Sequence, residues 1–248
     1  MEVIEQVVRD TEELINRKVL AVYLRGSRMR GLNDDGSDYD LTVITNPMKR
    51  ELLTNVIFSE KLRLPQYNVE GNITTTAHLF KMLLKGSPIA LETIHAQPIY
   101  IDKSYKILAS FLYESRKIIL QSRARSYLLS NIRMCKMNLN RTVKQSDPKK
   151  IRKSLIYAKM VLLQCDSVSS GDSLDFGVPF NIELRDYLCG MKEKSTLKDY
   201  EMCLEEMNEK EVLYTSDSYQ DNKSLSIFDD LESKIFDVLF FDRQLENV

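Results

Sequence analysis

Apolar and polar residues alternate with two different periods along this chain of 248 residues, and the period changes near residue 104. Before that point, short apolar runs of strand length, such as 19–24 and 41–44, are separated by turn residues. After it, apolar residues recur every three or four positions almost throughout, which is typical of amphipathic helices. The pattern predicts a unit of strands and helices over residues 1–103 and a second, all-α domain over residues 104–248.

The remaining elements follow from the same periodicities and from Gly and Pro positions. Helical spacing predicts helices over 2–16, 49–53, 77–84, 104–120, 121–143, 148–165, 182–189, 196–214 and 225–245. Strand character predicts strands over 19–24, 38–44, 56–64 and 67–75, and polar residues predict a loop over 167–175. Gly86 is expected to end one helix and Pro88 to open the next, because their backbone preferences suit those positions.

The turn between the first two predicted strands carries the residues with the clearest chemistry. Asp38 and Asp40 are two positions apart in a strand, so both carboxylates point to one face. Like charges this close raise the pKa of one carboxyl unless a cation is bound, and oxygen ligands on a rigid strand suit magnesium better than zinc or calcium. Gly26 allows a ligand to approach the backbone closely, and Ser27 offers a hydroxyl and an N–H to an anion. Together these residues predict a site for a nucleoside triphosphate and a metal ion.

The same segment resembles the signature of the DNA polymerase beta superfamily of nucleotidyltransferases. That signature is an apolar residue, Gly26-Ser27, about ten further residues, and Asp38-x-Asp40 between apolar neighbours. The resemblance implies an α+β fold with an N-terminal mixed sheet and helices, followed by helices. It also implies an enzyme that transfers a nucleoside monophosphate from a triphosphate such as ATP to an acceptor hydroxyl, with two Mg²⁺ ions held by the Asp pair.

Members of this superfamily take a third carboxylate from a neighbouring strand. Glu70 is the only acid in the predicted strand 67–75, and Asn72 lies on the same face as the other candidate position. Glu70 would complete the metal site and help to take the acceptor proton. Arg28 and Arg30 follow the Gly-Ser turn and are candidate triphosphate ligands, because a guanidinium matches phosphate oxygens.

A second, narrower resemblance concerns the RNA-ligase-associated branch of the superfamily (RlaP, YcgL-like). In that branch a helix ending in Gly-Asn-Pro precedes Leu-Glu-x-Leu, and here Gly86-Ser87-Pro88 precedes Leu91-Glu92-Thr93-Ile94. Counting back from this proline places the third acidic residue of the branch near Glu70. The chain departs from the branch in having Glu where Asp is usual, and Tyr157 and Lys159 where a His and an Arg are usual.

The near-neutral net charge hides a strong asymmetry. Residues 116–159 contain thirteen Lys or Arg and one acid, whereas residues 160–248 contain eight Lys or Arg and twenty acids. A basic segment of this density favours contact with a polyanion, so an RNA acceptor is predicted, held by four of these side chains, namely Arg123, Arg125, Arg133 and Lys136. The alternative is a solvated helix face that pairs with the acidic C-terminal third.

Composition and cysteine spacing exclude several other classes of protein. The four cysteines form no Cys-x-x-Cys and only two histidines are present, so neither a zinc site nor a disulfide framework is indicated. The apolar runs are too short to span a bilayer and the first residues are acidic, so a cytoplasmic protein without membrane contact is expected. Two other functions stay open: a nucleotidyltransferase that modifies a protein acceptor, as adenylylating antitoxins do, and an inactive nucleotide- or RNA-binding module.

Overall fold

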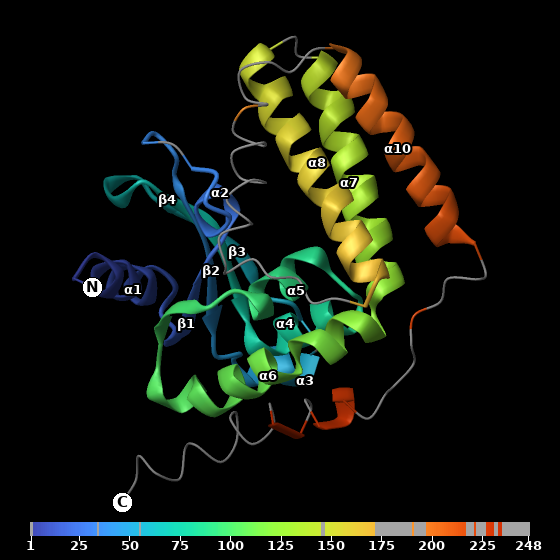
Figure 1. The fold of residues 1–248 in the computed structure, drawn as a ribbon. Coiled ribbons are helices and arrows are strands. Elements are labelled where there is room, and N and C mark those ends of the chain that lie inside the picture. Colours follow the sequence, from blue (N-terminus) through green and yellow to red (C-terminus); the bar gives the residue numbers. More distant parts are fainter. Residues whose placement is uncertain are drawn as a thin grey trace, which may run out of the picture.

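The computed structural model describes residues 2–33, 35–54, 56–144, 147–171, 190, 197–216, 221, 227–230 and 233–234 (Figure 1). Five strands form one sheet in the order β3-β4-β2-β1-β5. Their bounds are β1 Val19–Leu24, β2 Tyr39–Thr45, β3 Ser59–Leu64, β4 Val69–Thr75 and β5 Pro98–Ile101. The sheet is mixed, because β2 and β4 run parallel while the other neighbours run antiparallel.

Helices connect these strands and then continue alone. Their bounds are α1 Glu2–Ile15, α2 Gly26–Met29, α3 Lys49–Thr54, α4 Thr76–Leu84, α5 Pro88–His95, α6 Lys106–Ser122, α7 Ala124–Lys144, α8 Pro148–Ser169 and α10 Leu197–Thr215, with 3₁₀ turns at Pro65–Tyr67 and Lys103–Tyr105. No described helix is long and apolar enough to cross a membrane. The α+β architecture predicted from the sequence, a mixed sheet followed by helices, is confirmed.

The two faces of the sheet meet different partners. Leu41 of β2 belongs to one buried cluster with Val7 and Val8 of α1, while Ile44 of β2 belongs to a second cluster with residues of α4, α5 and α6. Figure 1 shows α1 on the side of the sheet away from these three helices. Successive strand side chains point to opposite faces, so Asp40 shares the face of Ile44. The predicted catalytic face is therefore the one that the later helices cover.

The helices after residue 104 pack onto that same face. One continuous buried cluster includes Leu20 and Ile44 of the sheet, Leu91 of α5, Leu128 of α7 and Leu162 of α8. In Figure 1 α7 and α8 form an antiparallel pair, with α10 against them on the side away from α2. Because the core is shared, α8 is held at a fixed position beside the strands that carry the Asp pair. The division into units at residue 103 stays a prediction.

Most predicted elements agree with the structure within a few residues, and the differences have local causes. The sequence pattern does not predict β5, because a strand of four residues that begins at a proline is too short to show a period. The segment 56–58 precedes β3 without joining it, and α8 continues to Ser169 where a loop was expected. The predicted helix 182–189 lies outside the described residues, and so does most of the predicted helix 225–245.

Candidate active site

Asp40 lies at the start of β2 and is half-buried, and Asp38 precedes that strand. The backbone N–H of Arg25 donates to the Asp40 carbonyl oxygen over 2.7 Å, which joins the end of β1 to the start of β2. Asp38 is close enough for its negative charge to raise the pKa of the Asp40 carboxyl. The structure therefore brings the two predicted carboxylates together.

Gly26 presses against the Asp40 carboxylate. Its φ is +64°, in the left-handed region, and it opens the four-residue helix α2. A Cβ built on Gly26 would lie 1.8 Å from Asp40 Oδ2, far inside van der Waals contact. Both the backbone conformation and the space therefore require glycine here. Ser27 follows directly, so the Gly-Ser turn stands beside the Asp40 carboxylate.

Glu70 is the register partner of Asp40 on the neighbouring parallel strand β4. Paired residues of adjacent strands point to the same face, so both carboxylates stand on the helical face of the sheet. The Glu70 side chain is 58% exposed and lies 4.0 Å from Arg63 on β3. Asn72, the other candidate, pairs with Thr42, one step deeper in the sheet. Register thus places Glu70, rather than Asn72, beside Asp40.

The electrostatic surroundings of Asp40 are divided between like and opposite charges. Burial is the main cause that raises its pKa, and the negative charges of Asp38 and Glu70 raise it further. The positive charges of Lys153 and Arg25 oppose this rise. A half-buried carboxylate with two acidic neighbours is a site that a divalent cation would stabilise. Among the described residues, no three His, Cys, Asp or Glu side chains already converge as metal ligands.

Arg28 and Arg30, both predicted to bind triphosphate, have contacts within the protein. The Arg28 guanidinium donates to the carbonyl oxygens of Ser37 (2.6 Å) and Asp38 (3.1 Å), and its central carbon lies 3.9 Å from the centre of the Tyr39 ring. These contacts hold the loop that leads into Asp38. Arg30 is 7% exposed and donates to a carboxylate oxygen of α5, so it lies below the surface of the site.

α8 supplies a site residue that the sequence did not single out. Lys153 and Tyr157 lie one helical turn apart on one face of α8. The Tyr157 ring centre is 5.6 Å from the Arg30 guanidinium carbon, which fixes this face of α8 over the site, and the charge of exposed Lys153 reaches Asp40. A lysine within a basic run of the sequence gives no sign of where its side chain points. Only the packing of α8 shows that Lys153 faces the site.

Two of the four side chains predicted to hold RNA pair with the acidic helix α10. Arg133 and Lys136 contact the two oxygens of Glu211 at 2.8 and 2.6 Å. Lys159 similarly lies 3.5 Å from Glu206 of α10. This is the pairing that the alternative to RNA contact anticipated. The helix α10 also lies on the side of α7 and α8 away from α2 (Figure 1).

The other two predicted RNA ligands hold backbone. Arg123 donates to the Leu84 carbonyl at the end of α4 over 2.8 Å, and its guanidinium lies 4.5 Å from the centre of the Phe228 ring. Arg125 donates to the carbonyl of Tyr214 near the end of α10 over 2.9 Å. Both arginines therefore connect α7 and its preceding turn to segments that are distant in sequence.

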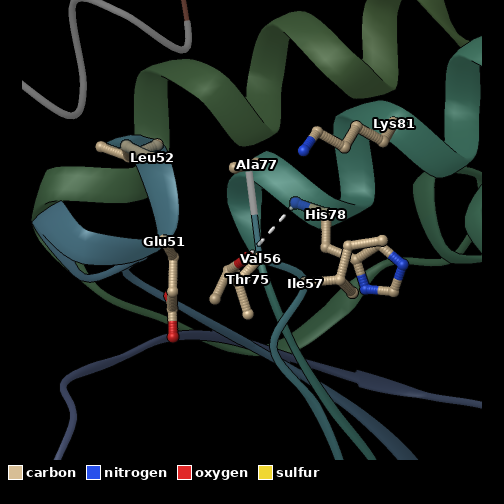
Figure 2. A pocket seen from close by; sticks show the side chains of 8 residues that line it. All are labelled: Glu51, Leu52, Val56, Ile57, Thr75, Ala77, His78 and Lys81. Carbon is tan, nitrogen blue, oxygen red and sulfur yellow. Dashed lines mark hydrogen bonds between the residues drawn. The ribbon is translucent and has the colours of Figure 1, made fainter. Parts of the chain in front are cut away.

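Figure 2 shows a pocket at the opposite end of β4 from Glu70, lined by Glu51, Leu52, Val56, Ile57, Thr75, Ala77, His78 and Lys81. Thr75 is five residues beyond Glu70 on the strand, which corresponds to roughly 16 Å. Thr75 accepts a hydrogen bond from the His78 backbone N–H over 3.2 Å, and the Glu51 carboxylate is bound to Arg17. The pocket is separate from Asp38 and Asp40, and Glu51 is the one acidic residue among the described residues that line it.

A comparison with protein families identifies a nucleotidyltransferase domain in this chain. Residues 4–119 match the family model described as "Nucleotidyltransferase domain", which spans the sheet, its helices and most of α6. A solved structure of a nucleotidyltransferase-like protein from Exiguobacterium sibiricum 255-15 covers 97% of this chain and 91% of its own, with 14% identity and a TM-score of 0.32. No curated protein matches the chain.

Proposed function

We propose that this protein is a metal-dependent nucleotidyltransferase that moves a nucleoside monophosphate from a triphosphate to an acceptor hydroxyl. The acceptor oxygen bonds to the α-phosphorus, the bond from that phosphorus to the α–β bridging oxygen breaks, and pyrophosphate leaves. The observation that carries the proposal is the close contact of Gly26 with the Asp40 carboxylate, with Asp38 and Glu70 beside it. The match of residues 4–119 to a nucleotidyltransferase domain supports it.

The residues present fit a magnesium site. Asp38, Asp40 and Glu70 are hard oxygen donors, and the charges of Asp38 and Glu70 raise the pKa of Asp40, so the group is one that a cation would stabilise. Asp38 and Asp40 would hold two ions, and Glu70 would contribute to the one nearest the acceptor. Bound magnesium offsets the charge on the attacking and leaving oxygens. Gly26 and Ser27 would contact the phosphates, with Arg28 supporting the loop from below.

Glu70→Gln tests the third carboxylate. The change keeps side-chain size but removes the charge, so we expect transfer to fall by about a hundredfold or more, as for loss of a catalytic acid or base. Triphosphate binding through Asp38 and Asp40 is expected to persist. Single-turnover transfer and equilibrium binding measure the two effects, with Asn72→Asp as the companion variant. Parental activity in Glu70→Gln would place the third ligand elsewhere.

RNA is the acceptor that we propose. Support comes from exposed basic side chains where α7 ends and α8 begins, namely Arg141, Lys144 and Lys150, whose polar contacts among the described residues are only with neighbours within four residues, Asn138 and Asp147. They lie within a few turns of Lys153, whose charge reaches Asp40. Of the four residues predicted from the sequence, Arg133 and Lys136 contact Glu211 of α10, and Arg123 and Arg125 contact backbone carbonyls. The end of the α7–α8 pair is therefore the better surface for an RNA strand.

Salt dependence distinguishes these two surfaces. Each neutralised phosphate of a single strand contributes about −0.7 to the slope of log affinity against log salt, so replacing Arg141, Lys144 and Lys150 by Gln should flatten the slope by about 2. The control is Arg133→Gln with Lys136→Gln, which should lower the melting temperature and leave the slope unchanged, because it breaks the contacts with Glu211. A flatter slope in the Arg133 and Lys136 variant alone would instead assign RNA binding to those two residues.

The same preparation separates the other functions. Incubation with each labelled triphosphate, magnesium, and either total RNA or total protein shows where the label goes. Label in a polypeptide would favour a protein acceptor over RNA. Triphosphate binding without any transfer would favour an inactive binding module.

A further inference from the structure

Glu92 is a buried carboxylate whose role the proposed reaction does not explain. It belongs to the Leu91–Ile94 motif on α5 and is 2% exposed. Its Oε2 accepts hydrogen bonds from Arg25 Nη2 at 3.2 Å and from Arg30 Nη2 at 2.8 Å. A buried carboxylate is costly to keep unless it is paired, and here one carboxylate serves two guanidiniums. Glu92 therefore holds both arginine side chains.

Both arginines also hold the Gly-Ser turn. Arg25 directly precedes Gly26, and its backbone N–H donates to the Asp40 carbonyl over 2.7 Å. Arg30 Nη1 donates to the Gly26 carbonyl over 3.3 Å. The two side chains that Glu92 binds thus flank the turn on either side. Their geometry is fixed from α5, an element that contributes no residue to the predicted metal site.

The position of this turn decides how much space remains beside Asp40. Gly26 leaves no room for a side chain between its backbone and the Asp40 carboxylate, because an added methyl carbon would lie 1.8 Å from Asp40 Oδ2. A small shift of the turn would either close on Asp40 or open a gap where phosphate contacts are needed. A displaced turn would therefore bind the triphosphate less tightly.

We propose that Glu92 is a positioning residue that, through Arg25 and Arg30, fixes the Gly26-Ser27 turn at the separation from Asp40 that a bound triphosphate requires. The inference rests on the proposed function for its ligand. Tyr157 of α8 lies against Arg30, so the helical region supports the same arrangement.

The chain offers a matched control in the Arg17–Glu51 pair. Arg17 and Glu51 are 8% and 13% exposed and form two hydrogen bonds of 2.9 and 2.5 Å. Glu51 lines the pocket at the other end of the sheet (Figure 2). Glu51→Gln and Glu92→Gln each remove one negative charge from an arginine contact, which is part-buried for Glu51 and buried for Glu92. A general loss of stability would therefore affect both variants alike.

The experiment compares these variants by amide hydrogen exchange without nucleotide and by steady-state transfer with magnesium and ATP. Both should melt at a lower temperature than the parent protein. We expect only Glu92→Gln to speed exchange at the amides of residues 25–32 and to raise KM for ATP by about tenfold, with a smaller change in kcat, as for lost ground-state binding. Equal exchange and equal KM in the two variants would overturn the inference.

Glu92→Asp covers the case in which Glu92→Gln does not fold. It keeps the charge and withdraws the carboxylate by one methylene, so folding is expected with faster exchange over residues 25–32 and a smaller rise in KM. Unchanged exchange in this variant counts against positioning. Because exchange is measured without nucleotide, it decides the inference even if the parent protein transfers nothing, a result that would refute the proposed function alone.

Discussion

Asp40→Asn is expected to lower the rate of nucleotidyl transfer by about a thousandfold or more, which corresponds to about 4 kcal/mol of lost transition-state stabilisation. The change removes a proposed magnesium ligand and keeps the shape of the side chain against Gly26. Asp38→Asn should have an effect of the same kind. Single-turnover transfer with saturating triphosphate is the measurement, and an Asp40→Asn rate within tenfold of the parent would contradict the metal assignment.

The same variant should be at least as stable as the parent when magnesium is absent. Burial first, and then the charge of Asp38, raise the pKa of Asp40 in the folded protein above its ordinary value of 3.8. A carboxyl with a raised pKa binds its proton more tightly in the folded protein than in the unfolded chain. Its contribution to stability therefore declines as the pH rises from the ordinary pKa through the raised pKa. At neutral pH the ionised group is therefore destabilising, and asparagine removes this cost.

Thermal unfolding in the presence of a chelator measures this effect. Between pH 7 and pH 4 the parent should gain stability relative to Asp40→Asn, because only the parent can protonate Asp40. A melting temperature several degrees below the parent at pH 7 would show that asparagine disturbs the packing, and the loss of activity would then need the Asp38 variant for its interpretation.

Gly26→Ala is expected to inactivate the protein nearly as completely as loss of Asp40. Two costs combine: a left-handed backbone is unfavourable for alanine by about 1–2 kcal/mol, and the new methyl group would lie 1.8 Å from Asp40 Oδ2. The turn or the carboxylate must move to relieve the contact. Because both positions belong to the proposed site, we expect transfer to fall by about a hundredfold or more.

Gly171→Ala isolates the backbone cost. Gly171, just beyond α8, has φ of +84°, and an added Cβ there meets none of the described atoms within 4 Å. This variant should lose about 1–2 kcal/mol of stability through its backbone alone and keep parental transfer. If Gly26→Ala and Gly171→Ala had equal effects on both stability and transfer, the close contact between Gly26 and Asp40 would have no catalytic importance.

Local patterns were sufficient for the elements that form the site. The apolar runs around the Gly-Ser turn and the Asp pair fix β1 and β2, because strand alternation and turn residues act over a few positions. Glu70 was one of two candidates on β4, and the sequence left Asn72 open. The parallel register of β2 and β4 pairs Glu70 with Asp40, and no local pattern determines register between strands that are joined by a long connection.

Charge patterns did not show toward which neighbours the basic side chains point. The basic segment 116–159 is evident from the sequence, yet its side chains serve different purposes that depend on the helix face each one occupies. Arg133 and Lys136 pair with Glu211, whereas Lys153 extends its charge toward Asp40. Helical spacing alone groups residues by face but does not say which face meets which neighbour.

The sequence by itself determined the fold class, the Gly-Ser turn and the Asp pair, because these depend on contacts between residues near one another in the chain. Only the tertiary structure decided that Glu92 binds Arg25 and Arg30, that α8 covers the site, and that Arg28 supports the Asp38 loop. Those contacts join α5, α8 and the Gly-Ser turn, and they form only when burial of one shared core brings distant segments together.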